Sequence, residues 1–324
     1  MITLDILKGM DIEKDLERLE DILQGAINSE EPQLSRMSGH ILFLESWRIR
    51  SAIALTVYRA CWGHNSEEVL PVMAALRMFH TVTMIHDDLI YKAPTHLGAP
   101  SLHKMFGKNE AIITADFLYA KAFGLCKSYE SDVTDMAVKA CTGLAEGEVM
   151  ELNAKIADIT VETYIAIITK KSAGVFSTAT RLAAWIARAP AEKLESMELM
   201  GQYLGIAHQM IDDYLDLGGT ACMPEPRGTK ILLGKVTLPI IRARDQLGDR
   251  TQKQLVDIYR KRKRYKNDVK RVLRLVSSTD GMEFTKKKAE DLVEVALGEA
   301  EKLDSDLHRK ILMDLSRQIV KRCN

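Results

Sequence analysis

Apolar residues recur three and four positions apart along most of this chain, and this spacing constrains the fold more than any other feature. It is clear in VLPVMAALRMFHTVTMIH, in YIAIITKKSAGVFSTATRLAAWIA and in MGQYLGIAHQMIDDYLDL. A period of about 3.6 residues is typical of helices, whereas half-buried strands alternate with a period of two. Strand-like alternation is nearly absent, so the sequence predicts an all-α fold of about eight to twelve helices.

The chain is long and apolar enough to bury a sizeable core, with 324 residues of which 46% are hydrophobic. Turn-forming residues cluster in KAPTHLGAPS, in ARAPAEK and in GGTACMPEPRGTKILLGK, the longest interruption. We find no repeat of fixed period, no low-complexity tract and no linker. The sequence therefore predicts a single domain over residues 1–324.

The charge balance excludes some classes of partner. The 45 basic and 45 acidic side chains cancel, so the net charge recruits neither nucleic acid nor an acidic membrane surface. The basic run YRKRKRYKNDVKRVLR is interrupted by Asp268 and by regularly spaced apolar residues, which predicts a solvated helix face. Any phosphate binding must then be local.

The cysteines and the hydropathy indicate a cytoplasmic protein without a transmembrane segment. The five cysteines are scattered and form no CxxC pair, so neither a disulfide framework nor a zinc site is expected. A reducing compartment suits them. The opening MITLDILKGMDIEKDLERLE is too acidic for a signal peptide, and no stretch approaches about 18 uncharged apolar residues.

Two aspartate clusters lie on apolar helical segments. Asp87 and Asp88 follow His80 and Thr83 on one segment. A second segment ends with a cluster whose members, at positions i, i+1 and i+4, share one helix face: Asp212, Asp213 and Asp216. For either cluster alone, acids at a solvated helix end stay an alternative. Two such clusters, with lysines in loop-like positions, favour a diphosphate site bridged by Mg²⁺, because buried carboxylates need a cation and hard oxygen ligands select this ion.

The motifs, taken in order, resemble those of the all-trans isoprenyl diphosphate synthases, or polyprenyl synthetases, over nearly the whole chain. The resemblance rests on FHTVTMIHDDLI, GAPSLHKMFG, ADFLYAKAF, EGEVMEL, YIAIITKKSAGVF, GQYLGIAHQMIDDYLDL, GKVTLPII, GMEFTKKKAEDLVEVAL and RKILMDLSRQIVKR. It implies an isoprenoid-synthase-like helical bundle around a central cavity, with the two aspartate motifs facing each other across its mouth. Members of the family are typically dimers.

The resemblance also implies a reaction and its residues. In the family, Mg²⁺ held by both motifs stabilises the diphosphate of an allylic substrate as a leaving group, and the double bond of isopentenyl diphosphate attacks the resulting cation. The implied metal ligands are Asp87, Asp88, Asp212, Asp213 and Asp216. Gln209 matches the glutamine beside the reacting carbons. Lys171 and Lys235 match the lysines that reach the allylic diphosphate, with Ser172 in place of threonine after Lys171. The implied catalytic set is Asp87, Asp88, Lys171, Gln209, Asp212 and Lys235.

Several positions depart from the family pattern. Tyr91 stands where the first motif has its last acid, and a phenol with a pKa near 10 supplies no anion at pH 7. His96 and Leu97 replace an arginine pair, and Trp47 replaces a lysine upstream. In the long loop, Pro226 stands where we align another lysine, and two acids are replaced by Lys230 and Leu233.

The losses fall mainly on the isopentenyl diphosphate pocket, of which Arg48 and His80 remain as substrate-binding candidates. Each charged phosphate contact contributes about 1.5–3 kcal/mol, so two losses weaken binding by orders of magnitude. The allylic site keeps the second motif, Lys171 and Lys235. We therefore expect an impaired allylic site and a disabled isopentenyl diphosphate site.

Three hypotheses follow. The chain is a partner-dependent subunit of a hetero-oligomeric synthase, whose full-motif homologue carries a complete site. Alternatively, it is an autonomous homodimeric synthase, or it is a terpene synthase or cyclase that ionises an allylic diphosphate without isopentenyl diphosphate. The first motif ought to be maintained in a cyclase, which counts against the last hypothesis.

Product length depends on the residues below the first motif. Val82 and Thr83 are small and lie one helical turn below the motif, so they leave the cavity open at this depth. Phe79 lies about 12 Å down the helix from Asp87, and a product or bound tail of about C20 or longer is therefore expected. Phe79 is either the cavity floor or an ordinary packing residue.

Overall fold

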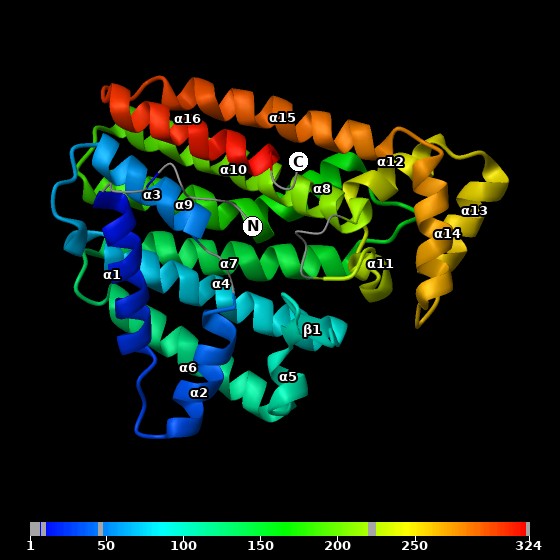
Figure 1. The fold of residues 1–324 in the computed structure, drawn as a ribbon, viewed down its shortest axis with the longest axis horizontal. Coiled ribbons are helices and arrows are strands. Elements are labelled where there is room, and N and C mark those ends of the chain that lie inside the picture. The colour runs from blue at the N-terminus through cyan, green and yellow to red at the C-terminus, as the bar shows by residue number, and fades with distance from the viewer. Residues whose placement is uncertain (1–6, 8–10, 45–47, 220–224, 322–324) are drawn as a thin grey trace.

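Helices make up nearly all of the computed structural model, which describes residues 7, 11–44, 48–219 and 225–321 (Figure 1). The predicted all-α fold is confirmed. The α-helices in these residues are α1 (Asp11–Ala26), α2 (Pro32–Leu42), α3 (Arg48–Ala60), α4 (Leu70–Tyr91), α5 (Leu102–Met105), α6 (Lys108–Cys126), α7 (Ser131–Asn153), α8 (Val161–Ile168), α9 (Gly174–Ile186), α10 (Ala191–Gly218), α11 (Thr229–Leu233), α12 (Leu238–Gln246), α13 (Asp249–Tyr259), α14 (Lys266–Ser277), α15 (Gly281–Ala300) and α16 (Asp306–Val320).

The predicted number of helices was too low. Two short helices, α5 and α11, lie inside or next to segments that the turn-forming residues marked as loops. A π-helical turn, Thr169–Ala173, also divides one long apolar stretch into α8 and α9. Periodicity identifies long helices well, but it does not detect single helical turns or interruptions of the hydrogen-bond pattern.

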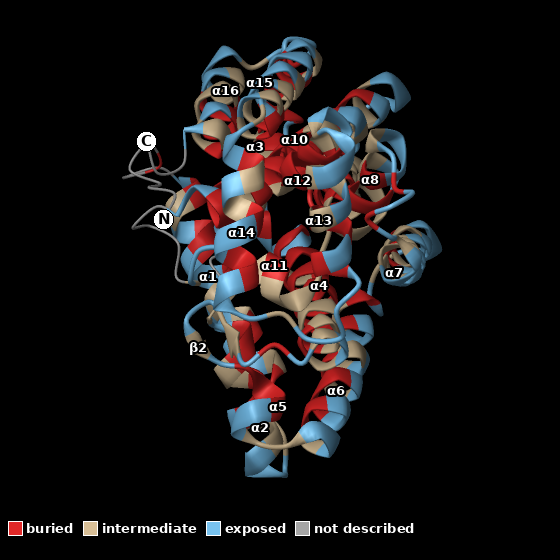
Figure 2. Ribbon diagram, turned by 90° about the vertical axis from the view of Figure 1, so that its right-hand side faces the viewer, coloured by how far each residue is buried: buried red, intermediate tan, exposed pale blue. Residues whose placement is uncertain are grey.

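The long helices run along the long axis of the molecule and enclose the main core (Figure 1). Helix α10 packs against α9 and α15, and α4 packs against α6. Buried residues concentrate along α3, α10 and α12, whereas α7 lies at the edge with much of its surface exposed (Figure 2). A smaller apolar cluster joins α12, α13 and α14 at one end of the bundle.

A two-stranded hairpin follows α4. Its strands are β1 (Thr95–His96) and β2 (Ala99–Pro100), paired antiparallel with Thr95 opposite Pro100. Leu97 and Gly98 form the tight turn with φ values of 48° and 81°. The hairpin thereby places His96 next to the carboxyl end of α4, where the first aspartate motif lies.

Membrane spans are not found in the described part of the chain, since none of its helices combines the length and apolar character needed to cross a bilayer. The cytoplasmic location and the single domain stay predictions.

Two glycines allow α7 and α10 to approach the π-helical turn that carries Lys171. A Cβ atom at Gly147 of α7 would lie 2.9 Å from Lys170 Cβ and 3.0 Å from Lys171 N. A Cβ atom at Gly205 of α10 would lie 2.5 Å from Ala173 Cα. Both helices therefore pack closely against the turn at these glycines. This close packing fixes the direction in which Lys171 projects from the turn.

We expect Gly205→Ala to destabilise the protein by about 3 kcal/mol, because the new methyl group overlaps backbone that cannot rotate away. Gly143→Ala is the matched control: it is also in a helix, nothing lies within 4 Å of its Cβ position, and it should stabilise α7 by up to about 1 kcal/mol. Urea denaturation measures the free energy of unfolding of both variants. Equal stability of the two variants would contradict this close approach.

Candidate functional site

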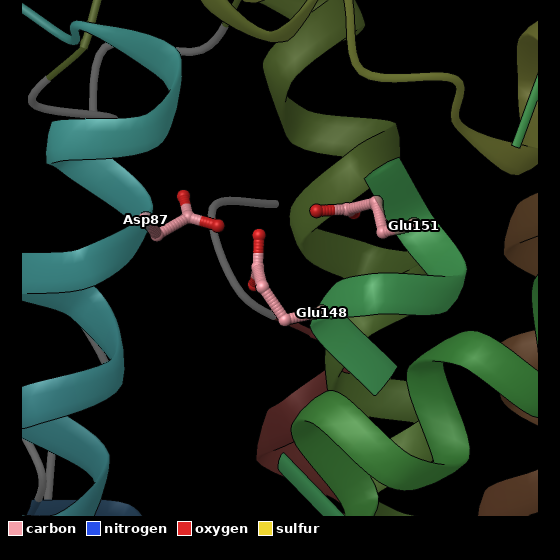
Figure 3. A group of neighbouring side chains, drawn as sticks. All are labelled: Asp87, Glu148 and Glu151. Atoms are coloured by element: carbon pink, nitrogen blue, oxygen red, sulfur yellow. The ribbon is translucent and has the colours of Figure 1, made fainter. Parts of the chain in front are cut away.

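Helices α4 and α7 bring three carboxylates together. Asp87 of α4 points toward Glu148 and Glu151 of α7 (Figure 3). One oxygen of each residue lies within 4.8 Å of the others. Because Glu148 and Glu151 are three residues apart, they project from the same side of α7. We call Asp87, Glu148 and Glu151 the acidic cluster.

Two lysines that are far apart in the sequence meet at this acidic cluster. Lys171 Nζ lies 2.8 Å from Asp87 Oδ1, 2.6 Å from Glu148 Oε2 and 2.5 Å from Glu151 Oε2. Lys235 Nζ lies 2.5 Å from Asp87 Oδ2 and 3.7 Å from Glu151 Oε2. Both lysines, which were predicted to reach the allylic diphosphate, thus contact Asp87 of the first motif directly.

Tyr91 borders the acidic cluster. Its hydroxyl donates a hydrogen bond to Glu151 Oε2 at 3.1 Å, and Lys235 Nζ lies 4.4 Å from the centre of its ring. Burial raises the pKa of the Tyr91 phenol, so it stays a neutral donor. Where the family pattern has an acid, this chain has a phenol that hydrogen-bonds to a carboxylate from another helix.

The charges in this region are coupled. Burial opposes ionisation of Asp87, but Lys235 and Lys171 outweigh it and hold the pKa of this carboxyl well below its usual range. For Glu148, burial prevails and raises the pKa. Burial also disfavours the charged form of Lys171, yet Asp87, Glu151 and Glu148 raise its pKa above the usual value. The two lysines thus favour the ionised forms of Asp87 and Glu151, whereas burial disfavours that of Glu148.

The acidic cluster has the chemistry of a divalent-metal site. Its donors are hard carboxylate oxygens, which suit Mg²⁺. Glu148 Oε1 is buried without a hydrogen-bond partner, so one ligand position is unused. The residues present therefore fit a metal ion here, although Glu148 and Glu151 were not among the predicted ligands. The motif EGEVMEL contained the signal, two acids three residues apart on one helix.

Asp88 lies apart from the acidic cluster. It is buried, with 6% of its surface exposed, and its Oδ2 lies 3.2 Å from His96 Nδ1 of the hairpin. Burial raises the pKa of Asp88, an effect that His96 partly offsets. The assignment of Asp88 as a metal ligand stays a prediction.

The second aspartate motif lies at the carboxyl end of α10, as predicted. Asp213 and Asp216 are buried, while Asp212 is half-buried with His208 Nδ1 at 3.3 Å from its Oδ2. Asp213 Oδ2 accepts a hydrogen bond of 2.6 Å from Tyr164. Asp213 Oδ1 lies 2.5 Å from Lys230 Nζ. Neither Tyr164 nor Lys230 was predicted as a partner.

A chain of hydrogen bonds connects the π-helical turn with the second motif. Ser172 Oγ donates to Gln209 Oε1 at 2.7 Å, and Gln209 Nε2 donates to Asp213 Oδ1 at 2.9 Å. Gln209 is thus fixed between the residue that follows Lys171 and the second motif. That Gln209 lies beside the reacting carbons stays a prediction.

The remaining predicted residues lie elsewhere. Arg48 is the first residue of α3 and is exposed, while His80 of α4 is 6% exposed. Trp47 lies outside the described residues. Pro226 is exposed, and the preceding Glu225 accepts hydrogen bonds from Thr95 Oγ1 at 2.8 Å and from the backbone N–H of Gly98 at 2.9 Å. These two contacts tie the loop after the second motif to the hairpin after the first.

A cavity of about 840 Å³ lies between α7 and α9, away from the acidic cluster. Its lining includes Asp135, Lys139 and Arg181 and none of the acidic-cluster carboxylates. Charged walls suit solvent better than a prenyl tail. We therefore place the candidate site at the acidic cluster and its two lysines.

The fold and this site define the isoprenoid-synthase class of all-α proteins. The chain belongs to the polyprenyl synthetase family, whose profile matches residues 31–276. This family consists of trans-prenyltransferases of isoprenoid biosynthesis, which bind allylic and isopentenyl diphosphates and use a divalent metal. The predicted family is confirmed.

Individual relatives cover most of the chain. Octaprenyl diphosphate synthase of Escherichia coli (strain K12) is 28% identical over 91% of this chain and 92% of its own length. A short chain isoprenyl diphosphate synthase of Methanocaldococcus jannaschii is 30% identical over 75% of this chain and 76% of its own length. The crystal structure of a decaprenyl diphosphate synthase from Rhodobacter capsulatus has a TM-score of 0.89 at 25% identity, covering 97% of this chain and 98% of that one.

Proposed function

We propose that this chain binds an allylic prenyl diphosphate and takes part in its elongation with isopentenyl diphosphate, as a partner-dependent subunit of a hetero-oligomeric synthase. The observation that carries the proposal is the convergence of Lys171 and Lys235 on Asp87, with Nζ–O distances of 2.8 and 2.5 Å. Half-buried ammonium groups in this arrangement suit a diphosphate, which they can bind in place of the carboxylates.

Each residue of the site has its own role in the proposed reaction. Lys171 and Lys235 contact the diphosphate oxygens and stabilise the charge that develops as the allylic C–O bond breaks. Gln209, held by Ser172 and Asp213, lies next to the reacting carbons. A Mg²⁺ ion held by Asp87, Glu148 and Glu151 would supply further charge stabilisation for the diphosphate.

The isopentenyl diphosphate half of the site supports dependence on a partner. His96 is engaged with Asp88, at 3.2 Å, and Leu97 has no charge and is 40% exposed. Neither residue can replace an arginine that grips a phosphate, because arginine offers a permanent charge and paired donors. A partner with a complete site would carry out condensation, and this chain would adjust activity or product length.

Helices α6 and α7 offer a surface for such a partner. Six large apolar side chains are exposed on them: Ile112, Ile113, Phe123, Val138, Val149 and Leu152. Exposed apolar residues gathered on two neighbouring helices are typical of an interface. We propose that this surface binds either a second copy or a full-motif homologue, the latter giving the active assembly.

The proposed product length rests on the side chains of α4 that lie below Asp87. Val82 is fully buried and Thr83 is half-buried, so the level below Asp87 carries no aromatic side chain. Phe79 packs against Tyr119 and Phe123 of α6, with ring centroids 5.8 and 4.8 Å away. This contact favours the interpretation of Phe79 as a packing residue. The proposed product of about C20 or longer rests on the absence of an aromatic side chain at positions 82 and 83.

An elongation assay tests the proposal. The purified chain is incubated with Mg²⁺, isopentenyl diphosphate and a C15 allylic diphosphate, alone and after co-expression with a full-motif homologue from the same genome. We expect little product from the chain alone and a changed rate or product length for the pair relative to the homologue by itself. Robust elongation by the chain alone would support the autonomous enzyme instead. Hydrocarbon formed without isopentenyl diphosphate would identify a terpene synthase.

A further inference from the structure

Asp213, in the second aspartate motif, has both of its oxygens occupied by protein donors. Its side chain is 3% exposed. Lys230 Nζ and Gln209 Nε2 reach Oδ1 at 2.5 and 2.9 Å, and the Tyr164 hydroxyl reaches Oδ2 at 2.6 Å. A carboxylate that accepts from an ammonium, an amide and a phenol in a buried position has little capacity left for a metal ion.

Lys230 is held in place by the backbone around it. The Gly228 N–H donates to the carbonyl oxygen of Asp216 at 2.8 Å, and the Lys230 N–H lies 3.3 Å from Asp216 Oδ1. The segment that leads into α11 is therefore attached to the carboxyl end of α10. From this attachment the lysine side chain, 23% exposed, extends back to Asp213.

The charge of Lys230 suits this position. Burial disfavours an ammonium, but Asp213, Asp212 and Asp216 together raise the pKa of Lys230 above its usual value. The lysine stands where the family pattern has an acid, so one negative charge has been exchanged for a positive one beside a group of three carboxylates. The motif is thereby partly neutralised by the chain itself.

The acids of the second motif are not drawn together in this structure as those of the acidic cluster are, although Asp216 Oδ2 is buried without a hydrogen-bond partner. Within the described ranges, the three acids whose ligand atoms all lie within 4.8 Å of one another are Asp87, Glu148 and Glu151. Asp212, Asp213 and Asp216 do not form such a group. A metal ion at the second motif would have to displace Lys230 from Asp213, and the two cations would repel each other.

We propose that the Lys230 ammonium replaces a metal ion at the second aspartate motif, so that this chain binds one divalent ion fewer than a chain with an acid at position 230. The inference deepens the proposed function, because it concerns the site at which that function would take place. Lys230 is a positioning residue here: it fixes Asp213, and through it Gln209, without a metal.

Counting bound Mn²⁺ by electron paramagnetic resonance, without substrate, tests the proposal. We expect Lys230→Gln to bind one more Mn²⁺ per chain than the wild type, because the neutral amide no longer repels the ion. Lys230→Arg keeps the charge and should bind the same number as the wild type. Lys261→Gln is the matched control, since Lys261 pairs with buried Asp268 at 2.5 Å and not with an acid of the second motif. It should also leave the number unchanged.

Two results would overturn the proposal. One is an unchanged number of Mn²⁺ ions in folded Lys230→Gln, checked by circular dichroism. The other is the binding of one Mn²⁺ fewer by the single variant Asp213→Asn than by the wild type, which would show that Asp213 already holds a metal ion. This variant still tests the proposal if Lys230→Gln fails to fold. Because no turnover is measured, failure of the proposed function would not affect either result.

Discussion

Lys171→Met is expected to weaken binding of a C20 allylic diphosphate about 10–100-fold and to lower prenyl transfer in the active assembly about 10²–10³-fold. Lys171 contacts all three acidic-cluster carboxylates, at 2.8, 2.6 and 2.5 Å, and is 11% exposed. The substitution keeps the length of the side chain and removes its charge from the place where the leaving diphosphate is stabilised. Titration calorimetry with Mg²⁺ present measures the affinity, and a radiolabel assay measures the transfer.

Lys170→Met is the control for this prediction. The side chain of Lys170 is 41% exposed and pairs with Glu146 on the outer side of the π-helical turn. Both substitutions remove one positive charge from adjacent positions, so an effect of the turn itself would appear in both. If Lys170→Met weakened diphosphate binding as much as Lys171→Met, the assignment of Lys171 to the diphosphate would be wrong.

Restoring the first motif is expected to produce the second large effect. We predict that the combined variant Tyr91→Asp, His96→Arg and Leu97→Arg elongates at least about 100-fold faster than the wild type, because two charged phosphate contacts contribute about 1.5–3 kcal/mol each. Arginine at position 96 also places a permanent cation next to Asp88, which His96 contacts in the wild type. Steady-state elongation with saturating Mg²⁺ measures the gain.

Single variants separate the contributions. Tyr91→Phe keeps the ring beside Lys235 and loses only the hydrogen bond to Glu151, so we expect no gain in elongation. Tyr91→Asp alone places a fourth carboxylate next to the acidic cluster and should lower thermal stability in the absence of Mg²⁺. If the combined variant were no faster than the wild type, the defect would lie elsewhere, and Trp47→Lys would be the next change to measure.

The helices that carry the motifs could be predicted because their apolar residues follow the helical period. Leu70–Tyr91 and Ala191–Gly218 are long, periodic helices, and the aspartates lie at their carboxyl ends as expected. The family resemblance placed Lys171 and Lys235 at the same site, although 64 residues separate them in the sequence. Both are now seen in contact with one carboxylate, that of Asp87.

The side-chain partners could not be predicted, because they depend on how distant segments pack. Glu151 reaches Tyr91 across 60 residues of chain, and Tyr164 reaches Asp213 across 49. Lys230 was identified only as a lost acid, since nothing in the sequence indicated that its ammonium would bind Asp213. The π-helical turn was also missed, because a single turn with a different hydrogen-bond pattern is too short to be recognised from the spacing of apolar residues.

The central claim is that this chain retains the allylic half of a two-substrate site and has lost the isopentenyl diphosphate half. Titration calorimetry with Mg²⁺ tests it most directly, by comparing the Kd of a C20 allylic diphosphate with that of isopentenyl diphosphate on the purified chain. We predict that the allylic diphosphate binds at least about 100-fold more tightly than isopentenyl diphosphate, because the isopentenyl diphosphate site has lost two charged phosphate contacts. Equal affinity for the two diphosphates would contradict the account.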